Sequence, residues 1–203
     1  MENPDPTTMP AITSQLTFFR EWIKHPLQMA SVLPSGRPLA RMMAAAMPAK
    51  ARCVIELGAG TGVITEALLQ HGVSAAQLLV LEMNATLHAI LRRRFPQAQV
   101  LCADARHVHE LALRTGVLAP TGADAILSSL GLLAMPPALQ HDIVSAALAV
   151  LRPGGVFVQY TYGWRSPMHE QVQRQLRLRC TRVGMVWRNL PPAQVYTYVR
   201  DDD

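Results

Sequence analysis

Several features that define other protein classes are scarce or absent in this chain of 203 residues. Its three cysteines, Cys53, Cys102 and Cys180, stand far apart, which argues against a disulfide framework or a cysteine zinc site and fits a reducing compartment. His107 and His109 do not share a helix face and have no evident third partner, so we expect no metal. Because no apolar run reaches the roughly 18 residues of a membrane span, and no basic segment precedes an apolar one at the start, we expect neither a transmembrane helix nor a signal peptide.

Charged and aromatic residues are also few, at 16% and 5%, whereas 50% of the residues are hydrophobic. Such a chain is too apolar for a disordered protein and long enough for one domain with a full core. The formal net charge of +5 and the pI of about 9.6 permit binding to nucleic acid or to an anionic membrane surface, and favour neither.

The most informative stretch is the apolar run at 54–57, which precedes three alternating glycines and a helical pattern. A continuous apolar run is typical of a buried parallel strand, and glycines after it let the backbone approach a ligand at the N-terminus of the next helix. A dinucleotide-binding loop would need glycine at 63, where this chain has Val63. The pattern instead resembles motif I of class I S-adenosylmethionine-dependent methyltransferases; the alternative is a turn that only joins a strand to a helix. The motif assigns cofactor binding to Glu56, Gly58, Ala59, Gly60, Thr61 and Gly62.

Strand-like and helix-like segments alternate from residue 52 onward. Strands are predicted at 52–57, 77–82, 98–102, 123–130, 155–162, 180–187 and 194–200, and helices at 62–71, 84–95, 105–116, 136–151 and 166–178. The alternation predicts a parallel sheet with helices on both faces, and the short link between the last two strands predicts a hairpin. The expected fold is therefore α/β and Rossmann-like, as in class I methyltransferases: a mostly parallel seven-stranded sheet with an antiparallel terminal hairpin and N-terminal helices.

Three regions are expected: a disordered tail at 1–13, N-terminal amphipathic or lid helices at 14–49, and the methyltransferase domain at 50–203. In the first helical segment Phe19 and Trp22 share a face, with Lys24 beside them. Such a basic amphipathic helix either lies in a membrane interface or packs over the mouth of the domain. A second helix is predicted to begin with Ser35 as its N-cap and to end near 47.

Two acids follow the second and third predicted strands. Glu82 lies 22 residues beyond Gly60, where a carboxylate of a nucleotide-binding α/β fold accepts hydrogen bonds from ribose hydroxyls; a solvated acid is the alternative. Asp104 either accepts from the adenine amino group, as an acid at this place does in methyltransferases, or caps the helix that follows. The expected cofactor site is completed by Met83, Ala105 and Ser128.

The fourth predicted strand leads to Ser-Ser-Leu-Gly-Leu-Leu at 128–133, where the methyl acceptor should lie. Base methyltransferases often carry Asn/Asp-Pro-Pro-Tyr there, and this chain has neither the amide nor the ring, which argues against a nucleic-acid base. Tyr160 and Tyr162 share a face of the fifth strand and are the candidate catalytic residues. Their rings could hold an ammonium group by cation–π attraction and a hydroxyl could accept its proton; packing in the core is the alternative.

Several further segments match one narrower pattern. They are Phe-Arg-Glu-Trp-Ile-Lys-His-Pro at 19–26, Pro-Ser at 34–35, Leu-Ala-Arg at 39–41, Arg-Phe-Pro at 94–96, Ala-Asp-Ala at 103–105, Leu-Arg-Pro-Gly-Gly at 151–155, Gln-Tyr-Thr-Tyr-Gly at 159–163 and Asn-Leu-Pro-Pro-Ala at 189–193. With the glycine turn they resemble the bacterial phospholipid N-methyltransferases of the PmtA type over about residues 14–200. The resemblance implies stepwise methylation of phosphatidylethanolamine toward phosphatidylcholine, with S-adenosyl-L-methionine as donor and S-adenosyl-L-homocysteine as product.

The resemblance also implies that the N-terminal helix docks on an anionic membrane. We therefore expect a cytoplasmic monomer, peripherally associated with the inner face of the cell membrane, that has a phospholipid substrate and no nucleic-acid partner. Substrate or membrane contact is assigned to Phe19, Trp22, Lys24, Ser35, Arg37 and Gly131.

One departure from the family pattern concerns the acceptor loop. Gly131 stands where related enzymes carry proline, and Ser129 where they carry glycine, which predicts a looser loop at the methyl acceptor. The amine of ornithine lipid therefore stays open as an alternative substrate. Two further alternatives are RNA adenine N6-methylation and a non-enzymatic protein that kept the cofactor pocket for binding.

Overall fold

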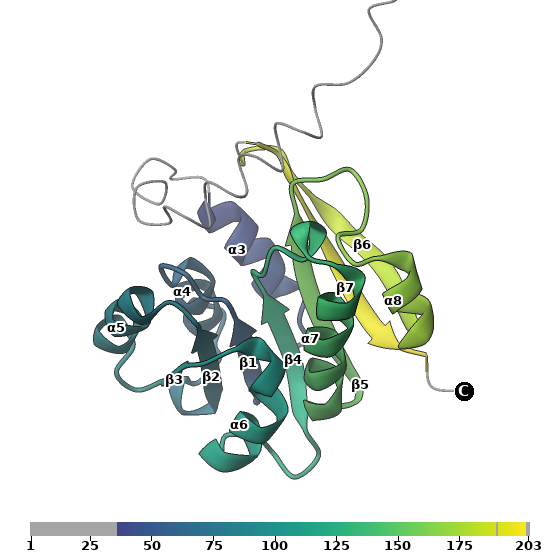
Figure 1. The fold of residues 1–203 in the computed structure, drawn as a ribbon. Helices are drawn as coiled ribbons and strands as arrows, with labels where there is room; N and C mark the ends of the chain where they lie inside the picture. The colour runs from purple at the N-terminus through teal and green to yellow at the C-terminus, as the bar shows by residue number, and fades with distance from the viewer. Residues whose placement is uncertain (1–35, 190, 202–203) are drawn as a thin grey trace, which may run out of the picture.

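The computed structural model describes residues 36–189 and 191–201, and its strands form a single seven-stranded sheet (Figure 1). The strands are β1 (Val54–Leu57), β2 (Leu78–Glu82), β3 (Gln99–Cys102), β4 (Ala123–Ser128), β5 (Leu151–Thr161), β6 (Leu178–Val186) and β7 (Ala193–Arg200). Their order is β3-β2-β1-β4-β5-β7-β6. The strands from β3 to β5 are parallel to their neighbours, whereas β7 is antiparallel to both β5 and β6. The predicted fold class is confirmed.

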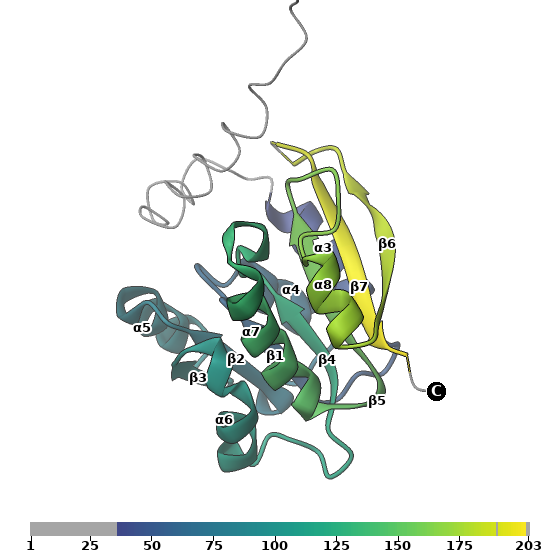
Figure 2. The same cartoon turned by 45° about the vertical axis from the view of Figure 1, so that its right-hand side comes forward.

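Helices cover both faces of this sheet (Figures 1 and 2). The helices are α3 (Gly36–Ala45), α4 (Val63–Gln70), α5 (Ala85–Arg94), α6 (Val108–Thr115), α7 (Pro137–Val150) and α8 (Glu170–Gln175), with 3-10 turns η1 (Ala75–Gln77), η2 (Ala105–His107) and η3 (Leu132–Ala134). Buried side chains of α3, α4 and α5 pack on one face, and those of α6, α7 and α8 pack on the other. This arrangement gives the domain two hydrophobic cores.

The two central strands show why the apolar runs predicted buried parallel strands. Every residue of β1 and of β2 is buried. Alternate side chains enter opposite cores, so Val54 packs with α3 and α4 while Ile55 packs with α6 and α7. Because both faces are covered, the strands need apolar residues at nearly every position. Glu56 and Glu82 are the exceptions, and the complete burial of Glu56 has to be explained.

Two elements differ most from the predicted boundaries. Strand β5 begins at Leu151 rather than at 155, because Leu151 pairs with Ala123 and Arg152 Nε donates to Asp124 Oδ1 at 2.6 Å. The helix predicted at 166–178 is only Glu170–Gln175. It begins after His169, whose Nδ1 accepts from the N–H of Gln171, so the cap shortens the helix at its N-terminus.

Helix α3 corresponds to the second predicted N-terminal helix. It buries Leu39, Ala40, Met43 and Ala44 against α4 and the sheet. At its start a Cβ added to Gly36 would lie 3.5 Å from Val63 Cγ1, so α3 begins beside the N-terminus of α4. Arg37 is exposed there. The predicted helix with Phe19, Trp22 and Lys24, and the predicted N-cap Ser35, lie outside the described residues.

Two further properties concern the described ranges. None of the helices in residues 36–189 and 191–201 has the length and apolar character that crossing a bilayer requires. In the same ranges, His, Cys, Asp and Glu side chains form no cluster of three or more that could hold a metal ion.

Candidate functional site

The turn between β1 and α4 adopts three left-handed conformations in five residues. Gly58, Gly60 and Gly62 have φ values of 73°, 58° and 85°. A Cβ at Gly58 would lie 2.8 Å from Leu130 Cδ2, and one at Gly62 would lie 2.6 Å from Phe95 Cε2, whereas one at Gly60 would meet nothing within 4 Å. Packing and conformation therefore both require the outer glycines. The middle glycine leaves an open backbone surface at the N-terminus of a helix, where an anionic or polar ligand can be bound by N–H groups.

Glu82 connects the end of β2 to this turn. Its Oε2 accepts from the N–H of Gly60 at 2.8 Å and its Oε1 accepts from the N–H of Asn84 at 2.8 Å. The Asn84 side chain in turn caps α5 by accepting from the N–H groups of Thr86 and Leu87. Glu82 is buried, with 8% of its surface exposed, and its bond to Gly60 places the carboxylate beside the turn. This position is compatible with the predicted ribose contact, because each oxygen retains a free lone pair.

Glu56 lies fully buried on β1, next to the same turn. Its Oε2 accepts from Thr65 Oγ1 at 2.6 Å, but its Oε1 has no hydrogen-bond partner. Burial is the main cause that raises the pKa of Glu56 to about 7. A buried acceptor without a donor is costly, and a cationic group bound beside it would supply both a donor and a compensating charge.

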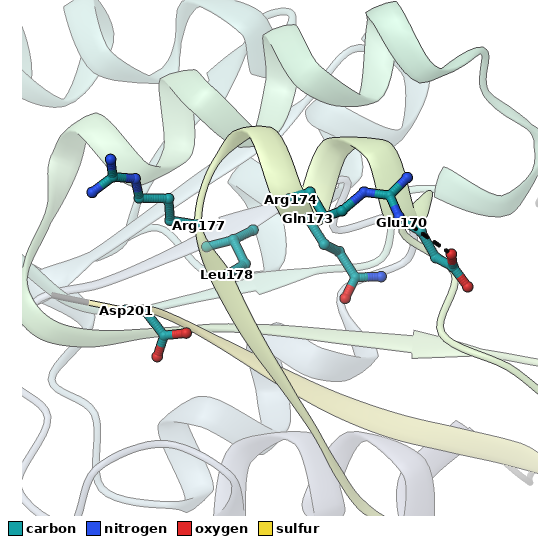
Figure 3. A pocket seen from close by; sticks show the side chains of 6 residues that line it. All are labelled: Glu170, Gln173, Arg174, Arg177, Leu178 and Asp201. Carbon is teal, nitrogen blue, oxygen red and sulfur yellow. Dashed lines mark ion pairs between the residues drawn. The ribbon is translucent and has the colours of Figure 1, made fainter. Parts of the chain in front are cut away.

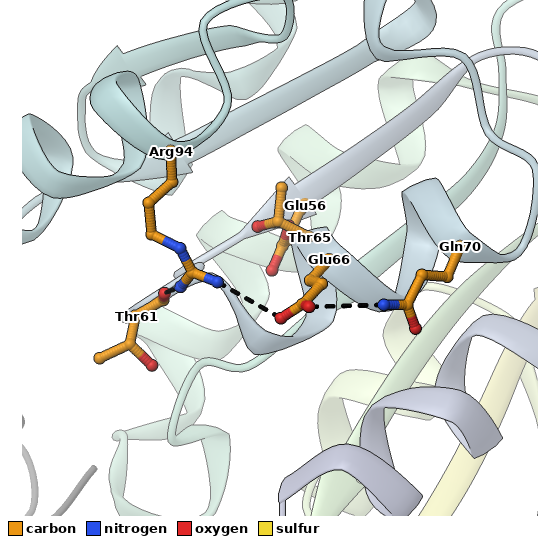
Figure 4. Close-up of polar contacts among 6 residues, drawn as sticks. All are labelled: Glu56, Thr61, Thr65, Glu66, Gln70 and Arg94. Carbon is orange, nitrogen blue, oxygen red and sulfur yellow. Dashed lines mark hydrogen bonds and ion pairs between the residues drawn. The ribbon is translucent and has the colours of Figure 1, made fainter. Parts of the chain in front are cut away.

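Arg94, at the end of α5, binds the glycine turn (Figure 4). Its Nη1 donates to the carbonyl oxygen of Thr61, and its Nη2 lies 3.3 Å from Glu66 Oε2. The guanidinium also stacks over the ring of Phe95, 5.0 Å from the ring centroid. The same Phe95 fills the space that a side chain at Gly62 would need, so Arg94 and Phe95 together hold the turn in place.

Asp104 has the local role that the sequence left as an alternative. It caps η2, with Oδ1 accepting from the N–H of Arg106 at 2.9 Å. Its Oδ2 accepts from Arg106 Nε at 3.0 Å and Nη2 at 2.7 Å, and these bonds to Arg106 lower the pKa of Asp104. The adenine contact remains a prediction. Next to it, the Met83 side chain is 70% exposed, which leaves an apolar group available to cover a base.

The acceptor loop after β4 is fixed rather than loose. The Ser128 hydroxyl accepts from the N–H of Leu130 at 3.3 Å, and Gln159 Nε2 donates to the carbonyl oxygen of Leu130 at 2.9 Å. Gln140 Nε2 donates to the carbonyl oxygen of Leu132 at 2.8 Å. Gly131 has φ −75°, which lies within the range that proline adopts. The expectation of a looser loop was therefore wrong, because buried amides hold the backbone that proline would otherwise have stiffened.

Gln159 also presents a second buried acceptor to the site. Its Nε2 donates to the carbonyl oxygens of Leu130 and Tyr160, which fixes the orientation of the amide because a flipped group would oppose two acceptors. Its Oε1 is then left buried and without a partner. Glu56 and Gln159 are thus the two buried side chains with an unpaired oxygen among the described residues, and both belong to strands whose ends form this site.

The two candidate tyrosines form a pair at the end of β5. Tyr160 and Tyr162 meet edge to face, with ring centroids 5.5 Å apart and planes at 77°. Tyr160 packs in the core on the α3 side, and Tyr162 packs against that core. Burial raises the pKa of both hydroxyls above the usual value near 10. Both phenols stay protonated at neutral pH, so neither is suited to act as a phenolate base; contact with an ammonium group through the rings remains a prediction.

Several residues that organise the site carried no assignment from the sequence. Thr65 holds Glu56, Asn84 holds the end of β2, and Gln140 holds the acceptor loop. Asn84 had a usable signal, because Asn directly before a helical pattern is a common N-cap. Thr65 and Gln140 had none, since only the fold brings each of them to its partner.

The chain also has an open pocket of about 510 Å³ far from this site (Figure 3). It is lined by Glu170, Gln173, Arg174, Arg177, Leu178 and Asp201. Leu178 begins β6 and Asp201 follows β7, so the pocket lies at the opposite edge of the sheet from the glycine turn and contributes nothing to it.

Comparison with known proteins identifies the family. Residues 54–155 match a family model described as a methyltransferase domain. A curated relative, ornithine lipid N-methyltransferase from Singulisphaera acidiphila, is 33% identical over 185 residues, which cover 88% of this chain and 92% of the relative. The chain belongs to the class I S-adenosylmethionine-dependent methyltransferases.

Solved methyltransferase structures share the fold of this methyltransferase at low sequence identity. A 1,6-didemethyltoxoflavin-N1-methyltransferase from Burkholderia thailandensis, solved with S-adenosylhomocysteine, has a TM-score of 0.63 at 16% identity and covers 98% of this chain and 94% of its own. The magnesium protoporphyrin IX methyltransferase from Synechocystis PCC 6803, solved with S-adenosylmethionine, has a TM-score of 0.63 at 11% identity. The match covers 95% of this chain and 100% of that one.

The residues present fit S-adenosylmethionine as the cofactor of this methyltransferase. The open face of Gly60 offers backbone, and Glu82 offers acceptor lone pairs for hydroxyl groups. The unpaired Oε1 of Glu56 suits the ammonium group of a methionyl moiety. The backbone turn and the two carboxylates are therefore the groups predicted to bind the cofactor.

The close packing at the turn predicts an unequal response of two glycines with positive φ. Gly62→Ala should add about 1–3 kcal/mol of overpacking to about 1–2 kcal/mol of backbone strain. Gly72→Ala should lose only the stability that backbone strain costs, because a Cβ at Gly72, where φ is 100°, meets nothing within 4 Å. Urea unfolding of both variants measures the difference, and equal losses would show that Phe95 yields without cost.

The raised pKa of Glu56 predicts a pH-dependent stability of the cofactor-free protein. With a folded pKa of about 7 against a usual 4.5, the stabilisation is complete below pH 4.5 and is lost as the pH rises through 7. Relative to Glu56→Gln, the wild type should lose about 2–3 kcal/mol of unfolding free energy between pH 5 and pH 8. Urea titrations without cofactor test this, and parallel pH profiles for the two proteins would contradict it.

Proposed function

We propose that this methyltransferase transfers methyl groups to the amine of an amino-lipid headgroup, with ornithine lipid and phosphatidylethanolamine as the two candidate substrates. The observation that carries the proposal is the 33% identity to an ornithine lipid N-methyltransferase over 88% of the chain. The acceptor loop supports it, because residues 128–133 hold neither the amide nor the aromatic ring with which base methyltransferases grip a planar base. Phosphatidylethanolamine is the substrate that the family resemblance implies.

The donor supplies an electrophilic sulfonium methyl group, and the chain has to bring a neutral amine in line with it. The amine nitrogen forms a bond to the methyl carbon while the carbon–sulfur bond breaks, and the amine proton leaves. Because both tyrosines keep their protons, neither is assigned as the base. The lipid ammonium instead gives its proton to bulk water before the neutral amine reaches the donor, and the nearby sulfonium charge favours this loss by lowering the pKa of the amine. Gln159 Oε1 is a fixed acceptor for a remaining N–H at the acceptor loop.

The proposed lipid substrate also implies where in the cell the protein acts. We propose that it works as a peripheral protein at an anionic membrane surface, where an amino lipid presents its headgroup. The formal net charge of +5 supports this, because cationic proteins concentrate at anionic surfaces. The predicted amphipathic helix with Phe19, Trp22 and Lys24 would contribute to this attachment.

Methyl transfer from labelled S-adenosylmethionine tests the proposal directly. Anionic vesicles with ornithine lipid, vesicles with phosphatidylethanolamine, and adenine-containing RNA are offered separately, and the products are resolved by thin-layer chromatography. Label should enter one or both lipids and not the RNA. Label in RNA alone would favour adenine methylation, and cofactor binding without transfer to any acceptor would favour the non-enzymatic binder.

Substitution of Tyr162 separates a ring role from a hydroxyl role. If the ring holds the ammonium, Tyr162→Phe should keep methyl transfer near the wild-type rate, whereas Tyr162→Ala should raise the KM for the lipid by up to about thirtyfold, equivalent to about 2 kcal/mol of cation–π attraction. Tyr198→Phe is the matched control, because Tyr198 is buried against Phe157 in the other core and bonds Ser166. Unchanged kinetics in both Tyr162 variants would remove this residue from the mechanism.

A further inference from the structure

Three exposed apolar side chains follow the ends of three strands in the same half of the sheet. Trp164 is 71% exposed, Trp187 is 70% exposed and Leu133 is 51% exposed. They come after β5, β6 and β4 respectively. Strands β5 and β6 run in the same direction because each is antiparallel to β7, so all three loops lie along one edge of the sheet (Figures 1 and 2). This is also the edge of the glycine turn, since β1 is parallel to β4.

We define the rim as Leu133, Trp164, Arg165, Trp187 and Arg188, and two contacts tie the loop after β5 to the segments on either side of it. A Cβ added to Gly163 would lie 3.3 Å from Leu133 Cδ2, which places the loop after β5 against the acceptor loop. Gln194 Nε2 donates to the carbonyl oxygen of Gly163 at 2.8 Å, which ties the same loop to the base of the β6–β7 hairpin. The rim is therefore held by the fold beside the mouth of the site.

Each exposed tryptophan is followed directly by an exposed arginine. The ion pairs found within residues 36–189 and 191–201 include neither Arg165 nor Arg188. The surrounding sequence is depleted in acid: between 143 and 200 the chain has eight arginines and a single carboxylate, Glu170. The rim thus combines large amphipathic rings with two arginines that form no ion pair among the described residues.

From these observations we infer that the rim is the surface with which the folded domain rests on an anionic lipid bilayer. Trp is enriched at the interface between lipid headgroups and acyl chains, and each Arg near an anionic surface adds attraction. A bilayer fits the rim better than a folded partner does, because the three apolar groups project from separate loop tips at one edge. The inference rests on the proposed action at a lipid headgroup, since the rim would bring that headgroup to the acceptor loop.

Vesicle binding of the full chain tests the inference. The proteins are the wild type, Trp164→Ala with Trp187→Ala, Arg165→Glu with Arg188→Glu, and the control Leu113→Ala with Arg114→Glu. The control pair resembles the rim chemically, with Leu113 60% exposed on α6, but Leu113 lines a pocket with Gly122 and Leu151 at the opposite edge of the sheet. Partitioning onto phosphatidylglycerol–phosphatidylcholine vesicles is measured by sedimentation, with pure phosphatidylcholine vesicles and homopolymer RNA as comparisons.

Each rim variant should lose at least about tenfold in partitioning onto anionic vesicles, and the control should match the wild type. Circular dichroism and the affinity for S-adenosylhomocysteine should be unchanged in all four proteins. In the W22F/W187F and W22F/W164F proteins, which each keep one of the three tryptophans, fluorescence should shift to the blue on vesicle addition and be quenched by brominated acyl chains. The quenching reports contact with lipid, which a structural loss would not produce.

Several outcomes would overturn the inference. The rim variants could bind vesicles as well as the wild type does, or the control could lose as much vesicle binding as the rim variants lose. The fluorescence of the single tryptophans could also stay unchanged when lipid is added. A blue-shifted emission before vesicles are added would mean that another part of the chain or a second copy covers the rim. A rim effect confined to RNA binding would also contradict it. Failure of the proposed function is distinguishable, because it shows as absence of methyl transfer to amino lipid dispersed in detergent micelles, where no bilayer is needed.

Discussion

The conformation of the turn at 58–62 is the constraint on which the rest of the site depends. Its outer glycines contact Leu130 of the acceptor loop and Phe95 at the end of α5, so the turn sets the spacing between the cofactor side and the acceptor side of the pocket. Glu82 fixes the turn from β2 through the N–H of Gly60, and Arg94 fixes it from α5 through the carbonyl oxygen of Thr61. A backbone held from three directions keeps its open N–H surface without having to reorganise when a ligand binds, which is the condition for effective binding by backbone dipoles.

This rigidity is accompanied by a local electrostatic cost. Raising the pKa of Glu56 from 4.5 to about 7 corresponds to about 3 kcal/mol of disfavoured ionisation, and the unpaired Oε1 adds a desolvated acceptor. Gln159 contributes a second unpaired oxygen on the acceptor side. Buried groups of this kind can persist where a ligand completes them, and our proposal assigns Glu56 to the cofactor side and Gln159 to the methyl-acceptor side. A ligand that pairs with these oxygens would therefore remove a cost that destabilises the empty site.

The fold could be predicted from the sequence because its determinants are local: apolar runs for the strands, glycines at the first turn, and a short Pro-rich link before β7. The positions of Glu56, Glu82 and Asp104 followed from where acids occur in or directly after the strands of this class of fold. The contacts that hold the site could not be predicted, because Thr65, Gln140 and Gln159 reach their partners only through tertiary packing. The loop at Gly131 shows the limit most clearly. A missing proline indicated flexibility, but buried amides from α7 and β5 provide the rigidity instead.

Isothermal titration of the purified protein with S-adenosylhomocysteine tests the central claim most directly, namely that the glycine turn, Glu82 and Glu56 bind the nucleoside and the methionyl ammonium of the cofactor. The account predicts saturable binding of one equivalent per chain. It also predicts release of protons near pH 6–7, detected as a dependence of the heat on the ionisation enthalpy of the buffer, because the bound ammonium would lower the raised pKa of Glu56. The proton release should be absent in Glu56→Gln. No detectable binding by the folded wild type would contradict the account.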